Sequence, residues 1–152
     1  MKRALLSAVL VALSIGCGPK FSEKDLTGTW QVDNASVPKT GKASAMASSS
    51  LVLREDHTFE IPVSSMGVTI KGSWSYAELK LSFKAASLSV KTPAMAQTRE
   101  LTIDQVLRFA QASGTPNSDL EEVRQFRDGI NLRVSEDGKT LTSEDNLVWR
   151  KG

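Results

Sequence analysis

Apolar and polar residues alternate through the middle of the chain. In the segments 50–54 and 58–63, large apolar residues recur at every second position, and the polar turn Glu55-Asp56-His57 separates the two segments. A period of two places alternate side chains on opposite faces of a strand, so these segments predict a hairpin with one buried face. The same alternation continues at residues 67–76, 79–83 and 87–91.

The period changes to that of a helix between residues 102 and 127. One helical face of the first segment is apolar, with Ile103, Val106, Leu107 and Ala110. Each of two segments begins with a pair that fits a capping box, Thr102 with Gln105 and Ser118 with Glu121. We therefore expect a two-helix insertion, at 102–113 and 118–127, that covers the sheet or plugs one end of a barrel.

Strands resume after the helices. Residues 129–134 alternate again, and Asp137-Gly138 predicts a hairpin turn, because glycine readily adopts the positive φ that such turns need. The return strand is expected to begin at Leu141, and residues 147–151 form the closing strand. Together with a first strand at 26–33, seven to nine short strands favour a small antiparallel barrel or a strongly curled sheet.

Two stretches share the order apolar, polar, glycine, hydroxyl, tryptophan: LTGTWQV at 26–32 and IKGSWSY at 70–76. Glycine in a strand lets the backbone bend or accept a bulky neighbour, and the tryptophan on the same face can fill that space. The first stretch resembles the Gly-x-Trp motif of lipocalins, and the strands that follow resemble the layout of small lipocalin-like lipoproteins.

This resemblance implies an up-and-down β-barrel. It also implies that a basic residue late in the barrel, here Arg150, packs over Trp30 in a cation–π contact. The loop at 34–50 stands where lipocalins carry a lid. The helical insertion departs from the lipocalin pattern, in which the helix lies near the C-terminus.

The N-terminus has the pattern of a secretion signal. Lys2 and Arg3 precede an uncharged, mostly apolar run at 4–15, which is shorter than the roughly 20 residues that a membrane-spanning helix needs. The following LSIGC resembles the lipobox of bacterial lipoproteins, although Ser14 stands where leucine is usual.

The lipobox resemblance implies cleavage after Gly16, a diacylglyceryl thioether on Cys17 and acylation, with palmitate for example, of the new amino group. Stable membrane anchoring takes about two acyl chains, and such a product exceeds that number. Gly18 in place of aspartate implies the outer rather than the inner membrane. Residues 1–16 are then the signal, residues 17–25 the lipidated cysteine with its tether, and residues 26–152 a single domain.

Cleavage would also change the composition. The mature chain has 152 − 16 = 136 residues with 19 − 2 = 17 basic and 17 acidic side chains, and no cysteine besides Cys17. A chain with no net charge and no basic stripe is not expected to bind nucleic acid. Without disulfides, the domain must depend on its core, for which this length is sufficient.

Few residues have the pattern of a catalytic or metal site. The one histidine, His57, lies at a predicted turn beside Glu55 and Asp56, where polar residues are ordinary. A zinc site usually needs three or four ligands, and the chain has no nucleophile elbow, P-loop or dinucleotide motif. We expect no enzyme, metal or cofactor.

Four aromatic residues are candidates for lining a ligand cavity: Trp30, Trp74, Tyr76 and Phe83. The alternative is that they fill the core, because the interior of a small barrel is often just wide enough for side chains. We therefore predict an envelope-anchored lipoprotein that binds a small apolar or amphipathic ligand under the loop at 34–50. The alternative is a protein-interaction or envelope-assembly module that uses an exposed face such as the helices at 102–127.

Overall fold

The computed structural model describes residues 21–37, 49–63, 67–91 and 97–152. The predicted signal peptide, Cys17 and most of the predicted loop at 34–50 lie outside these ranges. Nine strands lie within them: β1 Gly28–Val32, β2 Ser50–Leu53, β3 Thr58–Val63, β4 Val68–Ala77, β5 Lys80–Val90, β6 Arg99–Thr102, β7 Ile130–Val134, β8 Thr140–Thr142 and β9 Val148–Lys151. The helices are the 3₁₀ turns η1 Glu23–Leu26 and η2 Asn34–Ser36, and the α-helices α1 Ile103–Ala112 and α2 Asn117–Asp128.

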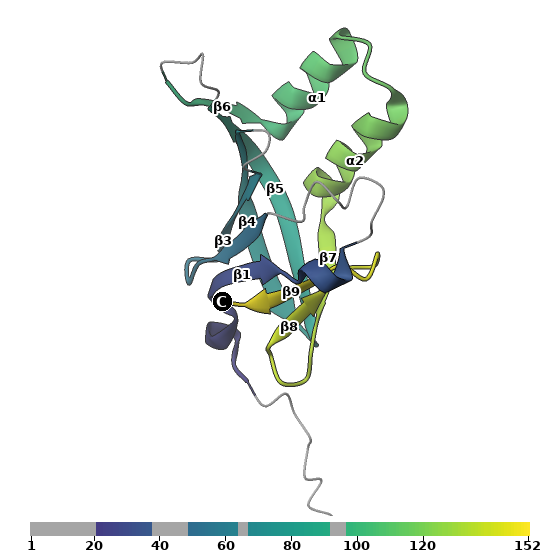
Figure 1. The fold of residues 1–152 in the computed structure, drawn as a ribbon. Coiled ribbons are helices and arrows are strands. Elements are labelled where there is room, and N and C mark those ends of the chain that lie inside the picture. The colour runs from purple at the N-terminus through teal and green to yellow at the C-terminus, as the bar shows by residue number, and fades with distance from the viewer. Residues whose placement is uncertain (1–20, 38–48, 64–66, 92–96) are drawn as a thin grey trace, which may run out of the picture.

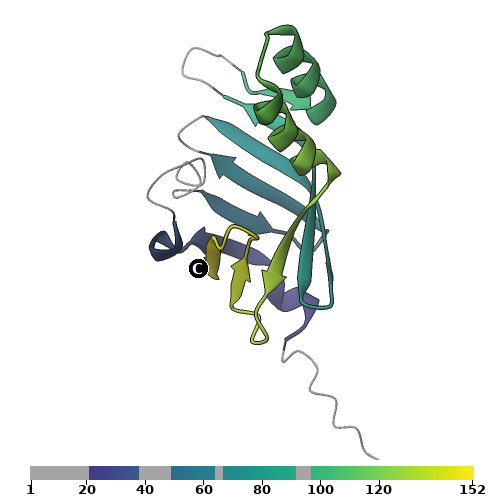
Figure 2. The same cartoon turned by 90° about the vertical axis from the view of Figure 1, so that its right-hand side faces the viewer.

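Eight of these strands close into an antiparallel barrel. The order around it is β4-β3-β2-β1-β9-β8-β7-β5, and pairing between β4 and β5 completes the circle. Strand β6 pairs with the second half of β5, and α1 and α2 connect β6 to β7. Figures 1 and 2 show the two helices projecting at one end of the barrel. The predicted mainly β fold with a two-helix insertion is therefore confirmed.

We call the end that carries α1, α2 and β6 the upper end of the barrel. The opposite, lower end carries η1, the turn between β4 and β5 and the turn between β7 and β8 (Figures 1 and 2). In the latter turn Gly138 has a φ of 69°, as the Asp-Gly pattern predicted.

Strand β5 differs from its prediction. The two short strands expected at 79–83 and 87–91 form one strand of 11 residues. Its first half pairs with β7 and its second half with β6, while β4 pairs along both halves. A register shift between Lys71 and Gly72 accommodates one extra residue of β5, so the strand continues through residues 84–86, which separate the two predicted strands.

Gly72 is required at this bulge by close packing. A Cβ atom built on Gly72 would overlap the carbonyl oxygen of Lys84 and lie 2.7 Å from Cε1 of Phe59. The second Gly-x-Trp copy therefore provides the close approach that its sequence suggested. Gly28 of the first copy is needed for a different reason, because its φ is 120°, where side chains other than glycine are strained.

The helix starts confirm one capping prediction and correct the other. At α1, Thr102 accepts a hydrogen bond from the Gln105 N–H, and the Gln105 side chain bonds back to the Thr102 N–H at 2.9 Å. At α2 the predicted Ser118–Glu121 capping box is wrong. The helix follows Pro116 without a side-chain cap, and Ser118 itself lies inside the first turn.

Candidate functional site

The aromatic residues predicted to line a cavity lie inside the barrel. Trp30 is 0% exposed, Trp74 is 3% exposed and Phe83 is 5% exposed. A side chain with no accessible surface borders neither solvent nor a void of water size, so the interior around Trp30 is filled. Tyr76 is partly buried and packs against the same core.

Hydrogen bonds and ring contacts hold these aromatic residues in place. The Trp30 indole N–H donates to the Leu26 carbonyl at 2.9 Å, and the Trp74 indole N–H donates to the Arg54 carbonyl at 3.1 Å. Phe83 meets Phe59 edge to face, with ring centroids 5.1 Å apart, a favourable geometry for aromatic pairs. These contacts are those of a packed core.

The cation over Trp30 is Lys151 and not the predicted Arg150. The Lys151 Nζ lies 6.0 Å from the Trp30 ring centroid, and Lys151 is directly opposite Trp30 in the pairing of β1 with β9. Because side chains alternate along a strand, Arg150 points to the other face. There its Nε donates to Asp33 at 2.8 Å.

The hydrogen bond from Arg150 also affects the acidity of Asp33. This bond lowers the pKa of Asp33 below its ordinary value, and the bond from the Ala35 N–H acts in the same direction. Asp33 in turn begins η2, which follows β1. The pair therefore ties the start of the predicted lid segment to the last strand of the barrel.

Tyr76 is the one described residue whose buried side-chain oxygen has no hydrogen-bond partner. Its ring lies 5.6 Å from that of Phe21, which precedes η1. A buried hydroxyl without a partner costs about 1–3 kcal/mol. Phe21 therefore covers Tyr76 by ring contact and not by a hydrogen bond to its hydroxyl.

A small hollow lies beside the one histidine. It has a volume of about 290 Å³, opens to solvent, and is lined by Glu23, Lys24, Thr27, Glu55, His57 and Trp74. His57 Nε2 lies 3.0 Å from Glu23, and the His57 ring meets Trp74 edge-on at 4.9 Å. Its φ of 63° places His57 in the left-handed region typical of a tight turn. The histidine thus joins η1 to the β2–β3 turn.

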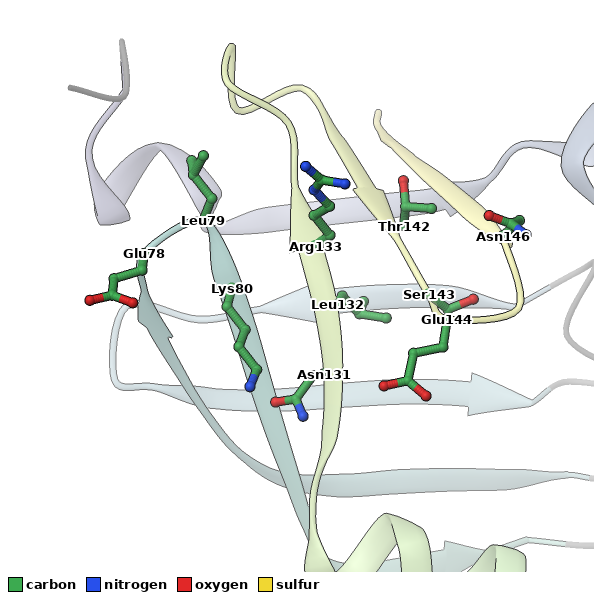
Figure 3. Close-up of a pocket in the computed structure, with 10 residues that line it drawn as sticks. All are labelled: Glu78, Leu79, Lys80, Asn131, Leu132, Arg133, Thr142, Ser143, Glu144 and Asn146. Carbon is green, nitrogen blue, oxygen red and sulfur yellow. The ribbon is translucent and has the colours of Figure 1, made fainter. Parts of the chain in front are cut away.

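A larger hollow, of about 490 Å³, lies between β5, β7 and the turn that joins β8 to β9 (Figure 3). It is open to solvent, and its charged lining residues have both signs: Glu78, Lys80, Arg133 and Glu144. Asn131 in its wall accepts a hydrogen bond from Ser82 at 2.7 Å. Small-molecule sites are usually enclosed, with only a few polar groups among apolar walls, whereas this hollow is open to solvent and four of its ten lining residues are charged.

Apolar side chains gather at the upper end. Ile70 faces Leu88 across the β4–β5 ladder, and Val68 faces Val90, and all four are only partly buried. On α1, Phe109 is 58% exposed. The upper end is therefore where the described residues leave apolar surface available for binding.

The described residues contain no group of three or more His, Cys, Asp or Glu side chains placed to hold a metal ion. Within those same ranges, none of the helices combines the length and apolar character needed to cross a bilayer. In the comparisons with known proteins, no family model, no curated protein and no solved structure matches this chain.

Proposed function

We propose that this protein is a lipoprotein of the bacterial envelope, anchored through Cys17, whose barrel acts as a binding module for another envelope protein. The anchor rests on the resemblance of residues 13–17 to a lipobox, and one observation carries the binding role. The aromatic residues suited to a ligand cavity are used in packing, whereas Phe109 on α1 is 58% exposed. Aromatic side chains are enriched where proteins bind one another.

The two helices form a firm support for such a surface. Leu107 from α1 and two residues of α2, Val123 and Phe126, pack against the barrel core. Leu120 is 2% exposed. A surface that is already ordered loses little conformational entropy on binding, which favours affinity.

Photo-crosslinking in the source cell tests this proposal. A photoreactive aromatic residue replaces Phe109 in one variant and Ser75, an exposed residue of β4, in the control. We expect the probe at 109 to form one reproducible adduct with an envelope protein, and excess unmodified chain to suppress it. Identical adducts from both positions, or none from either, would reject the helices as the binding surface.

A second candidate function is binding of a small apolar or amphipathic molecule at the upper end. The partly exposed pairs Ile70–Leu88 and Val68–Val90 support it, because they lie on the inner face of β4 and β5 above the filled interior. Native mass spectrometry of the protein extracted gently from envelopes tests it. An added mass that disappears on denaturation favours this candidate, and a bare chain mass speaks against it.

The anchor is tested separately from the binding partner. Mass spectrometry of the N-terminal peptide should show Cys17 with a diacylglyceryl group and an acylated amino group. A Cys17→Ser chain should lose both modifications. An unmodified Cys17 in the mature protein would reject the lipoprotein assignment and leave the binding proposal standing.

A further inference from the structure

The residues just before β1 close the lower end of the barrel. Phe21 packs against Tyr76, with ring centroids 5.6 Å apart. It also lies on Gly138 in the β7–β8 turn, where an added Cβ would come within 2.6 Å of the Phe21 ring. The ring of Phe21 is thus seated between a barrel strand and a hairpin turn.

Contacts with the first and last strands hold the rest of this segment. Leu26 is 0% exposed, and its carbonyl accepts the hydrogen bond from the Trp30 indole. One residue earlier, the carbonyl of Asp25 accepts a hydrogen bond from Lys151 Nζ. η1 is therefore held by contacts with both β1 and β9, the first and last strands of the barrel.

Two polar side-chain contacts join the same segment to the β2–β3 turn, and the one made by Lys24 is an ion pair. Glu23 lies 3.0 Å from His57, and Lys24 lies 3.6 Å from Glu55. Exposed pairs contribute little stability. Together with the contacts to Tyr76, Gly138, β1 and β9, however, they hold the segment against the first strand, the last strand and two turns of the barrel. We call residues 21–26 the plug, and we expect the plug to move with the barrel as one body.

The plug lies close to the proposed lipid anchor along the chain. From Cys17 to Phe21 there are four residue steps, which span at most about 14 Å when fully extended. If Cys17 carries lipid, as the proposed function requires, the lower end cannot move farther than this from the membrane surface.

We infer that the barrel stands on the membrane with its plugged lower end facing the lipid headgroups and with α1 and α2 directed away. Strand β5 runs from the lower to the upper end over 11 residues, a length of roughly 35 Å. Because barrel strands tilt by about 35–45° to the barrel axis, the upper end lies roughly 25–30 Å above the lower end. The protein partner proposed for α1 would therefore be met at about this distance or more from the anchoring membrane, and not within its headgroup layer.

The chemistry of the lower end is that of a surface kept outside the hydrocarbon. Its turns expose charged side chains: Lys24, Glu55, Glu78, Glu136, Asp137 and Lys139. Charged groups are strongly disfavoured in hydrocarbon, so this end should rest in the aqueous headgroup region without insertion.

Energy transfer to the membrane tests the orientation. The lipidated protein is reconstituted in phosphatidylcholine vesicles that carry an acceptor dye on some headgroups. A donor dye is attached through an azide-bearing residue in place of Glu136 at the lower end or of Gln111 in α1, both exposed. We expect transfer to be at least twofold more efficient from 136 than from 111. Equal transfer from the two positions, or stronger transfer from 111, would overturn the inference.

A lengthened tether is the matched control. Inserting fifteen Gly and Ser residues between Gly18 and Pro19 leaves the plug intact but removes the length limit. The difference between 136 and 111 should then shrink, and an unchanged difference would show that the tether does not set the orientation. If Cys17 proves unmodified in cells, the chain can be coupled through this single thiol to a maleimide lipid. A failed anchor is thereby distinguished from a failed orientation.

Discussion

Replacing Gly72 with alanine should strongly destabilise the barrel, although the change adds only one methyl group. Gly72 lies at the register shift between β4 and β5, where one extra residue of β5 is accommodated. An added Cβ would overlap the Lys84 carbonyl oxygen and would lie 2.8 Å from Ala85 Cα and 2.7 Å from Phe59 Cε1. Two of these three neighbours are backbone atoms, so a change of side-chain rotamer cannot relieve the overlap.

The magnitude follows from what must move. Overpacking a core costs about 1–3 kcal/mol when side chains can shift. Here the β4–β5 ladder itself must separate, so we expect a loss of about 3 kcal/mol or slightly more for Gly72→Ala. With a urea m-value of about 1.5 kcal/mol/M for a domain of this size, the unfolding midpoint should fall by about 2 M.

Urea unfolding, followed by tryptophan fluorescence and far-UV circular dichroism, measures this change. Ser73→Ala is the matched control, because Ser73 is the exposed neighbour on the same strand and should change stability by less than about 0.5 kcal/mol. Adding Phe59→Leu to Gly72→Ala should not restore stability, since the backbone overlap remains. A Gly72→Ala midpoint equal to that of the control, or recovery in the double variant, would refute the reasoning.

Three further predictions concern a turn, an ion pair and a helix cap. Glu78 and Leu79 both have positive φ, of 52° and 61°, which strains side chains other than glycine and asparagine. Replacing them with Asn and Gly should therefore raise the free energy of unfolding in urea by about 1 kcal/mol. A loss of stability would mean that Leu79 contributes more by packing than it costs by backbone strain. The pKa of Asp33 in the folded state is lowered from 3.8, so near and below that pH the folded state binds fewer protons than the unfolded state. The stability that this carboxylate contributes is therefore lost as pH falls below about 4 and through the folded-state pKa. Asp33→Asn should therefore show a shallower decline in acid melts, and an unchanged slope would contradict this. Thr102→Ala should cost about 1 kcal/mol through loss of the cap, whereas Ser118→Ala should be nearly neutral; equal losses would restore a capping role for the second residue.

Much of the fold could be predicted from local signals. The period-two segments at 50–54 and 58–63 became β2 and β3, with β3 at Thr58–Val63 as expected. Thr102 with Gln105 marked the start of α1. These signals are reliable because they depend on contacts between residues only a few positions apart.

Strand β6 was missed because its signal is not local. Its sequence, Arg99–Thr102, has no alternating apolar pattern, and it is a strand because β5 offers a free edge beside it. The continuity of β5 was missed for the same reason. Only its pairing with β4 and the bulge at Gly72 show that the two halves form one strand.

The candidate site depended even more on distant contacts. The four aromatic residues were correctly selected as inward-facing, but their periodicity could not distinguish a filled core from a lined cavity. That distinction depends on how side chains from all eight strands share one volume. The choice of Lys151 over Arg150 as the cation near Trp30 likewise depends on the register between β1 and β9.

The sequence by itself determined the strand-rich pattern, the turns, the helical insertion and the expectation of a lipid-anchored cysteine, because each is encoded in neighbouring residues. Tertiary structure decided that the sheet closes, that its interior is filled around Trp30, and that Phe21 and Leu26 plug the lower end. The physical reason is distance along the chain. Phe21 meets Tyr76 and Gly138 only after the barrel has brought together segments that are 55 and 117 residues away in sequence.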